Sequence, residues 1–274
     1  MENKVIILTD STADLPLELI KSRNIYQLPL YVNFGDIQYK DGVDITPKAL
    51  YEKVSETNMI PTTSAISPGD FINFFNAYKE EDIVYMGIGG SISGTLQSAY
   101  LAKETLNREN IYLVDSKNLS SGTGLLVLKA SDYRDKGLSG SEIKAKLDLL
   151  VPKVRSQFAI LTLDYLHKGG RASGTAKLVG TVLGLKPIIK VIDGKLEVYK
   201  KPAGKMSRAL DIMIEDFNNT KIDEDYVFIT HSFSNKVDYI KERINAKNII
   251  VSEAGCVISS HCGAGTIGIL YIEK

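Results

Sequence analysis

Three hydroxyl-rich segments hold most of the chemistry that this chain could do. They lie far apart in the sequence and read Pro61-Thr62-Thr63-Ser64, Ser91-Ile92-Ser93-Gly94-Thr95 and Ser259-Ser260-His261-Cys262-Gly263. A fourth segment, Lys168-Gly169-Gly170-Arg171, adds a guanidinium group. Hydroxyls, one imidazole, one guanidinium and backbone N–H groups together suit the binding of an anion. The acid and base pairs expected for cutting a substrate are missing from these segments.

His261 stands out among the histidines, because small residues and hydroxyls flank it and let backbone approach a ligand closely. The alternative is a histidine that is hydrogen-bonded for structural reasons. No carboxylate or histidine cluster has metal-ligand spacing, so we expect neither a metal nor a cofactor. Cys256 and Cys262 form no disulfide framework and are expected to be buried free thiols.

The glycine-rich stretch from Gly87 to Thr95 leaves two other functions open. A dinucleotide fingerprint would need glycine at position 92, which is isoleucine, and no Walker sequence is present. A phosphate- or nucleotide-binding regulator that uses this loop is one possibility, and simple helix capping by Ser93 and Thr95 is the plain reading.

A serine-type esterase or acyltransferase is the other possibility, with Ser93 as nucleophile and a histidine as base. The segment Gly90 to Gly94 reads G-x-x-S-G, which misplaces the serine of a nucleophile elbow. The sequence does not show whether one of the three histidines reaches Ser93.

The overall composition limits the classes of partner that we expect for this chain. The chain has 274 residues, with 33 lysines plus arginines against 33 aspartates plus glutamates. A net charge of zero gives no long-range attraction to nucleic acid or to an anionic membrane. No run of 18 apolar residues is present, and the apolar run at 5–8 is too short for a signal peptide, so we expect a cytoplasmic protein.

The first half of the chain alternates strands and helices. Thr46-Pro47 and Ser67-Pro68 are typical helix starts. We predict strands at 5–9, 25–34, 37–39, 83–87 and 111–114, and helices at 47–55, 68–79 and 93–106 and within 117–155. This order indicates a three-layer α/β/α domain with a mostly parallel sheet over residues 1–155.

The second half carries a hairpin signal, Asp193-Gly194 between apolar runs. We predict strands at 158–163, 187–192, 195–200, 226–230, 249–252 and 268–272, and helices at 164–168, from Ser173, at 205–217 and at 235–244. A two-layer α/β domain with a mixed sheet and helices on one side is expected over residues 156–274. No linker composition marks the boundary near residue 156.

Seven short motifs, in order along the whole chain, resemble the DegV family of bacterial fatty-acid-binding proteins. They are Thr9-Asp10-Ser11-Thr12-Ala13-Asp14-Leu15-Pro16, Pro61-Thr62-Thr63-Ser64 with Ser67-Pro68, Ser91-Ile92-Ser93-Gly94-Thr95, Val114-Asp115-Ser116, His167-Lys168-Gly169-Gly170-Arg171, Gly184-Leu185-Lys186-Pro187-Ile188 and His261-Cys262-Gly263-Ala264-Gly265. Each motif alone is weak, whereas seven in register are specific.

The resemblance implies two α/β domains with one long-chain fatty acid buried between and within them. It implies that the carboxylate is held by Thr63, Ser93 and His261. Further residues are expected near the head group or at a partner contact: Thr62, Gly94, Thr95 and Arg171.

The resemblance also implies a partner. Some members of the family deliver the bound acid to a separate fatty-acid kinase, which phosphorylates the carboxylate to an acyl phosphate for phospholipid synthesis. This chain would then be a carrier rather than an enzyme, with the fatty acid as its ligand, transient membrane contact and no nucleic acid among its partners.

Overall fold

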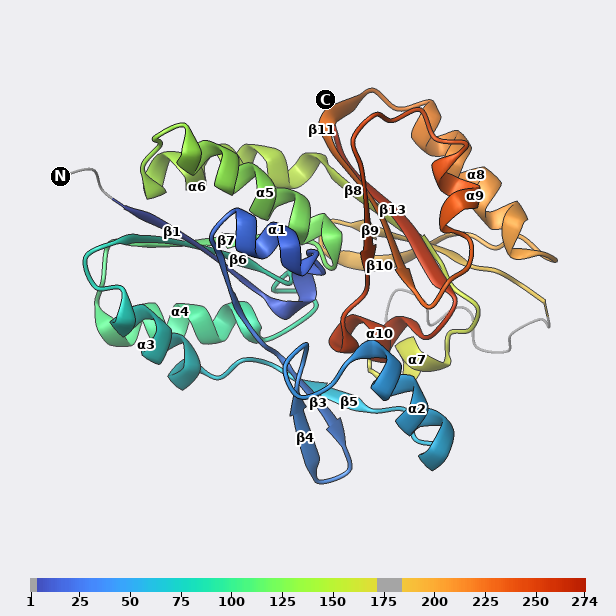
Figure 1. Ribbon diagram of the computed structural model, residues 1–274, viewed down its shortest axis with the longest axis horizontal. Coiled ribbons are helices and arrows are strands. Elements are labelled where there is room, and N and C mark those ends of the chain that lie inside the picture. The colour runs from blue at the N-terminus through green and yellow to red at the C-terminus, as the bar shows by residue number, and fades with distance from the viewer. Residues whose placement is uncertain (1–3, 172–183) are drawn as a thin grey trace.

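The computed structural model describes residues 4–171 and 184–274, and in them the chain forms a parallel sheet, a mixed sheet and a small antiparallel sheet (Figure 1). The parallel sheet has the strand order β2-β1-β6-β7. Its strands are β1 (Val5–Asp10), β2 (Ile25–Leu28), β6 (Asp82–Gly87) and β7 (Ile111–Asp115). β1 and β6 are fully buried, as expected for strands covered on both faces.

Helices cover both faces of this sheet (Figure 1). One layer contains α3 (Pro68–Ala77) and α4 (Thr95–Leu106), and the other contains α5 (Ser121–Asp135) and α6 (Gly140–Leu150). Helix α3 begins as predicted: Ser67 and Asp70 form a reciprocal capping box and proline occupies the first turn. The first half of the chain therefore has the expected α/β/α layers.

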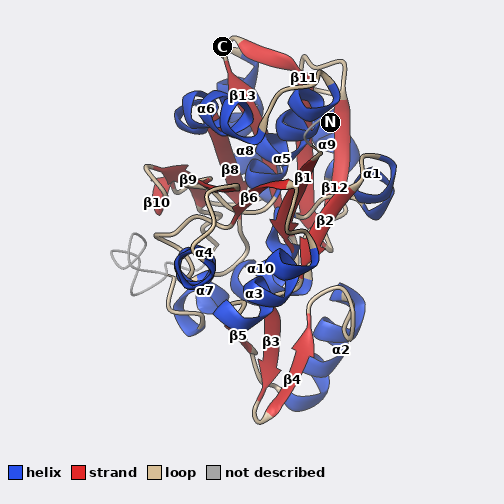
Figure 2. Ribbon diagram, turned by 90° about the vertical axis from the view of Figure 1, so that its left-hand side faces the viewer, coloured by secondary structure: helices blue, strands red, loops and turns tan. Residues whose placement is uncertain are grey.

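A three-stranded antiparallel sheet, of order β4-β3-β5, projects from this core (Figure 2). It consists of β3 (Tyr31–Phe34), β4 (Ile37–Lys40) and β5 (Thr62–Ser64), and the helix α2 (Pro47–Thr57) lies beside it. The short helices η1 (Ser11–Ala13) and α1 (Leu17–Ser22) follow β1 in the chain. The single strand predicted at 25–34 is wrong. It is broken at 29–30, because β2 belongs to the parallel sheet and β3 to the projecting one.

The mixed sheet has six strands in the order β10-β9-β8-β13-β11-β12. They are β8 (Val154–Ala159), β9 (Ile188–Ile192), β10 (Lys195–Lys200), β11 (Ile222–Ser232), β12 (Ile249–Glu253) and β13 (Thr266–Glu273). The hairpin turn is as predicted, with positive φ at both Asp193 and Gly194. The strand predicted at 158–163 is displaced: β8 starts at Val154, after the short helix η2 (Val151–Lys153).

Helix α5 lies between the two large sheets. Its apolar residues pack in one cluster with Val84 of the parallel sheet and with Phe228 and Leu270 of the mixed sheet. The opposite face of the mixed sheet is covered by α8 (Met206–Asn218) and α9 (Val237–Lys241). The predicted fold class, a helix-covered parallel sheet and a second, mixed sheet, is confirmed. Helices cover both faces of the mixed sheet, however, because α5 is shared.

Two short helices close one end of the mixed sheet (Figure 1). The helix α7 (Asp164–Lys168) was predicted, whereas α10 (Cys256–Cys262) was not. The helix predicted from Ser173 lies outside the described residues. The division into domains at residues 155 and 156 stays a prediction, and the strand β8 runs across that position.

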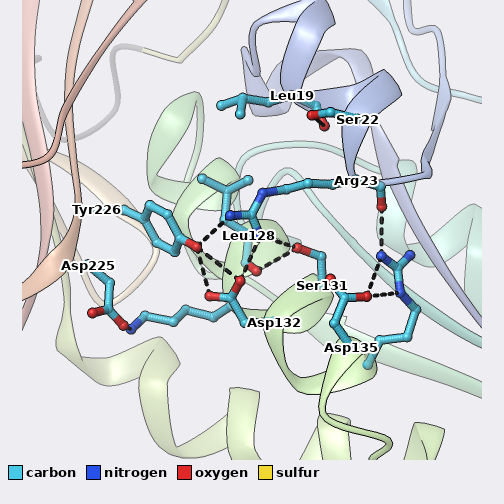
Figure 3. Close-up of polar contacts among 11 residues, drawn as sticks. Leu19, Ser22, Arg23, Leu128, Ser131, Asp132, Asp135, Asp225 and Tyr226 are labelled. Atoms are coloured by element: carbon cyan, nitrogen blue, oxygen red, sulfur yellow. Dashed lines mark hydrogen bonds and ion pairs between the residues drawn. The ribbon is translucent and has the colours of Figure 1, made fainter.

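A polar junction joins the C-terminal half of α5 to β11 (Figure 3). It lies at the end of α5 that is farther from α10 (Figure 1). Arg23 donates to Asp132 at 2.6 Å and to the Tyr226 hydroxyl at 2.7 Å, and Tyr226 also donates to Asp132. One turn away, Lys129 bonds both Asp223 and Asp225 at 2.6 Å. These residues together form the junction between α5 and β11.

Candidate functional site

A cavity of about 110 Å³ lies where α10, the mixed sheet, the loop after β6 and β5 meet. Its wall is mainly apolar, with side chains from every one of these parts and from the start of α5. They include Ile88, Leu119, Phe158, Leu196, Ile258 and Leu270. Five of the predicted site residues, which come from segments far apart in the sequence, also line it: Thr63, Ser93, Gly94, Arg171 and His261.

Thr63 and His261 meet directly at this cavity. The Nε2 atom of His261 on α10 lies 2.8 Å from the hydroxyl of Thr63 on β5. The other ring nitrogen, Nδ1, is buried and has no hydrogen-bond partner among the described residues. When Nε2 carries the hydrogen and donates to Thr63, the Thr63 hydroxyl keeps its own hydrogen for a ligand.

Burial keeps the imidazole neutral. It lowers the pKa of His261 to about 4, and the nearby Arg171 guanidinium adds to this effect. Gly169 fixes the ring from the other side: a Cβ atom at this position would lie 2.0 Å from Nδ1. Only glycine fits there, which explains the glycine next to the end of α7 in physical terms.

Ser93 and Thr95 pair with each other at the start of α4. Their hydroxyl oxygens are 2.9 Å apart, and the Thr95 N–H donates to the Ser93 oxygen at 3.3 Å. Gly94 occupies the N-cap position of the helix and lines the cavity. With Thr95 donating to Ser93, the Ser93 hydrogen is left to donate into the cavity.

Arg171 connects two segments of the cavity wall. Its Nε donates to the Ile92 carbonyl at 3.1 Å and one Nη donates to the Gly169 carbonyl at 2.7 Å. The side chain is half-buried rather than fully solvated. It therefore brings a positive charge to the part of the cavity that also holds Ile92 and His261.

Two predicted neighbours of the site do not line the cavity. Thr62 is exposed on β5, because alternate residues of a strand point to opposite faces and Thr63 takes the inner one. Thr95 is fully buried behind Ser93. Whether Thr63, Ser93 and His261 contact a ligand stays a prediction.

Several polar residues of the wall belong to none of the predicted site residues, and Ser232 is the best connected of them. Tyr51 of α2 lies 2.6 Å from the Ser232 hydroxyl, which lies 2.9 Å from that of Ser259, and Ser259 donates to the Ala254 carbonyl at 3.1 Å. These bonds run in one direction, so Ser232 has donated its hydrogen inside the protein. No local pattern marks Ser232, since its partners lie 27 and 181 residues away.

Three other hydroxyls of the wall are used in the same way. Ser120 donates to Asp14 at 2.5 Å, Thr230 donates to Ser121, and Thr266 donates to the Cys262 carbonyl. Each of these hydrogens already has an acceptor within the protein. Three hydroxyls of the wall can still turn a hydrogen toward a bound anion: those of Thr63 and Ser93, whose partners can act as donors, and that of Ser64, which accepts from Asn33 at 2.7 Å. The guanidinium of Arg171 lines the same cavity.

The contacts of Ser93 and His261 argue against a serine hydrolase. A nucleophile needs its base within hydrogen-bond reach, yet Ser93 bonds Thr95 and the Nε2 of His261 bonds Thr63. No group of three or more histidine, cysteine or acidic residues in the described parts of the chain could hold a metal. Cys256 and Cys262 are free and buried, and burial raises the pKa of the Cys262 thiol to about 12.

The glycine-rich loop also fits poorly to a phosphate. Its N–H groups are largely taken: Ile88 donates to Asp10, Gly89 to the Asn118 carbonyl and Gly90 to Asp115. Two of these three acceptors are carboxylates, which would repel a phosphate placed beside them. The loop is held by acidic residues of the strand ends instead of being open for an anion.

The family model described as uncharacterised protein, DegV family, matches residues 4–274. This chain belongs to the DegV family. A DegV domain-containing protein of Clostridium acetobutylicum is 37% identical over 277 residues, which cover 99% of this chain and 99% of that protein. The resemblance drawn from the seven motifs is therefore confirmed.

Solved DegV structures share the fold. A DegV family protein from Thermus thermophilus, solved with a description of its fatty acid binding, is 31% identical, with a TM-score of 0.90 over 99% of this chain and 100% of that one. DegV from Bacillus subtilis, described as a fatty acid binding protein, is 26% identical, with a TM-score of 0.85 over 99% of both chains. Solved members of the family thus bind fatty acids. No helix in residues 4–171 or 184–274 is long and apolar enough to cross a membrane.

Proposed function

We propose that this protein binds one long-chain fatty acid, with the carboxylate at Thr63, Ser93 and His261 and the tail along the apolar wall of the cavity. The observation that carries the proposal is the distribution of hydroxyl hydrogens. The hydrogens of Ser120, Thr230, Ser232 and Thr266 are used inside the protein, whereas Thr63, Ser64 and Ser93 can turn theirs toward a ligand. A carboxylate accepts hydrogen bonds only, so it matches this end of the cavity.

The energetics favour such a ligand. Each buried CH₂ group contributes about 0.8 kcal/mol before ordering costs, so a long acyl chain supplies most of the affinity. Hydrogen bonds to the ionised head group contribute roughly 1.5–3 kcal/mol each. When the neutral imidazole of His261 donates to Thr63, it holds this side chain in place and leaves the Thr63 hydrogen for the carboxylate.

The proposal extends to the use of the bound acid. We infer that the protein is a non-catalytic carrier, which presents the carboxylate to a separate fatty-acid kinase for conversion to an acyl phosphate. The family resemblance supports this role, as does the position of Arg171 between the loop at Ile92 and the end of α7. Its charge offsets that of the carboxylate in the carrier and of the acyl phosphate as it forms.

Binding is tested by native mass spectrometry of purified protein, delipidated and then reloaded with palmitate or oleate. The expected result is one fatty acid per chain. Thr63→Val should weaken binding by about tenfold or more, on the basis of one lost charge-assisted hydrogen bond. Thr62→Val is the matched control, because the same substitution on the exposed face of the same strand should leave affinity unchanged.

Assays of acyl-ester hydrolysis and of thermal stability on the same protein distinguish the other candidate functions. Protein that takes up no fatty acid but hydrolyses acyl esters would be an esterase, and stabilisation of the fold by ATP or NAD but not by oleate would indicate a nucleotide-binding regulator. The kinase step is tested with Arg171→Ala, which should lower acyl-phosphate formation by a purified fatty-acid kinase more than it lowers fatty-acid binding.

A further inference from the structure

The helix that carries His261 is too short to hold its own position. Helix α10 has seven residues, and isolated helices of this length are unstable in water. Its first N–H groups are instead bonded by two carboxylates from distant parts of the chain. Asp14 accepts from Gly255 N at 2.8 Å, and Asp41 accepts from Cys256 N at 2.7 Å and from Val257 N at 3.3 Å.

Asp14 bonds a second part of the cavity wall as well. Its other carboxylate oxygen accepts from the Ser120 hydroxyl at 2.5 Å, and its carbonyl accepts from Ser121 and Ser252. Both Asp14 (φ 48°) and Ser120 (φ 52°) have left-handed backbone conformations that non-glycine residues rarely adopt. Such strain persists where surrounding contacts over-determine it, and it is concentrated at functional sites.

The two carboxylates are held by donors rather than by cations. Asp14 and Asp41 are both buried, and neither belongs to an ion pair in the described parts of the chain. Burial raises the pKa of both side chains, which indicates that burying their charge is costly. Three backbone N–H groups and the Ser120 hydroxyl offset this cost, and all four belong to segments that line the cavity or carry its side chains. The Ser11 hydroxyl also lowers the pKa of Asp41.

We propose that Asp14 and Asp41 are positioning residues of the fatty-acid site, which set the place of the His261 imidazole through the start of α10 and the place of Ser120 through its hydroxyl. This inference rests on the proposed function. The far end of α10 shows why position matters: a Cβ at Gly169 would overlap His261, and a Cβ at Gly263 would lie 2.7 Å from the Tyr165 ring. Helix α10 is therefore confined at both ends, and a shift at its start moves the imidazole.

Asp41→Asn is the sharpest test. Both carboxylate oxygens of Asp41 accept N–H groups, so an amide nitrogen in place of one oxygen would face a donor. Asp14→Asn should have a smaller effect, because the Ser120 hydroxyl can rotate and accept from the new amide. Asparagine also tolerates the left-handed backbone of Asp14.

Asp82→Asn is the matched control. Asp82 is equally buried and accepts from Gly140 N at 2.9 Å at the start of α6, but it lies at the opposite end of β6 from the cavity. All three variants remove a buried carboxylate that binds a helix start. Only Asp14 and Asp41 bind the helix that carries His261.

Three measurements are made on the full chain: the melting temperature, the Kd for oleate and the NMR signals of the His261 imidazole in delipidated protein. Asp41→Asn should raise the Kd at least tenfold and shift the imidazole signals, while Asp82→Asn changes only the melting temperature. Wild-type Kd and imidazole signals in Asp41→Asn and in Asp14→Asn would overturn the inference. If wild-type protein binds no oleate, the proposed function fails, while the imidazole signals still decide whether the carboxylates position α10.

Discussion

The two ends of α5 are held by opposite kinds of polar contact. At the junction, Lys129 pairs with Asp223 and Asp225, and Arg23 pairs with Asp132, so every carboxylate has a cation beside it. At the cavity end, Asp14 is bonded by N–H and O–H donors instead. The junction reaches the surface, where Asp225 is 65% exposed, whereas the Asp14 side is buried.

The junction holds the two sheets together, whereas the cavity end of α5 belongs to the proposed ligand site. The exposed pairing at Asp225 can form and break with little change in free energy, so this part of the junction tolerates small movements, although Lys129 itself is buried. A buried carboxylate that is bonded by fixed N–H groups does not tolerate such movements, because a charge left without partners in the interior is costly. Helix α5 thus joins a tolerant contact at its C-terminal half to a rigid one at its N-terminus.

The largest effect should come from pH and should act at the cavity end. The pKa of His261 is lowered to about 4 in the folded protein from an ordinary value of 6.5, so the unfolded chain binds more protons between these values. Its contribution to stability is fully present above pH 6.5 and lost as pH falls toward 4. The difference is worth at most about 3 kcal/mol.

Urea unfolding of delipidated protein between pH 4 and 7 measures this effect, with His261→Gln as the comparison. The variant should lose much of the rise in stability across this window. The raised pKa values of Asp14 and Asp41 act in the opposite direction: their contribution is present below 3.8 and lost as pH rises. A wild-type slope that His261→Gln leaves unchanged would contradict the assignment.

Lys129→Met should break the junction and leave the cavity intact. The Lys129 side chain is buried, and its removal leaves Asp223 without a cation, which costs about 2–3 kcal/mol once the exposure of Asp225 is allowed for. The midpoint of urea unfolding should fall while the Kd for oleate stays within twofold. Loss of oleate binding by folded Lys129→Met would show that the two ends of α5 are coupled.

Gly169→Ala should have the opposite effect, which is weaker oleate binding with little loss of stability. The backbone of Gly169 is right-handed helical, so alanine fits its conformation, but the new methyl group would overlap the His261 ring. We expect the affinity for oleate to fall by about 2 kcal/mol, the size of one charge-assisted hydrogen bond, with little change in unfolding. Gly69→Ala, where the nearest atom is 3.6 Å away, is the control. Unchanged oleate affinity in Gly169→Ala would show that the imidazole position is not needed.

The smallest effect should come from salt. Raising ionic strength to 1 M screens partly exposed ion pairs such as Arg23–Asp132, so stability should fall by less than about 1 kcal/mol. The uncharged hydrogen bond between Thr63 and His261 should be insensitive to salt. Equal salt dependence in wild type and Lys129→Met would indicate that the junction contributes little through charge.

Elements governed by local contacts could be predicted from the sequence. The strands β1, β6 and β7 follow from short β-branched apolar runs, α3 from its capping box, and the β9–β10 hairpin from Asp193-Gly194. Elements that depend on distant partners could not. The sequence does not predict α10 because the N–H groups at its start are bonded by Asp14 and Asp41, which lie more than 200 residues away in the chain.

The sequence by itself determined the residue types of the site and, through seven motifs in register, the family. Only the tertiary structure decided which neighbouring residue faces the cavity, as with Thr63 and not Thr62, since strand pairing sets the side that each residue takes. It also decided which hydroxyl hydrogens remain for a ligand. That choice depends on acceptors such as Asp14 and Ser259, which long-range packing brings beside Ser120 and Ser232.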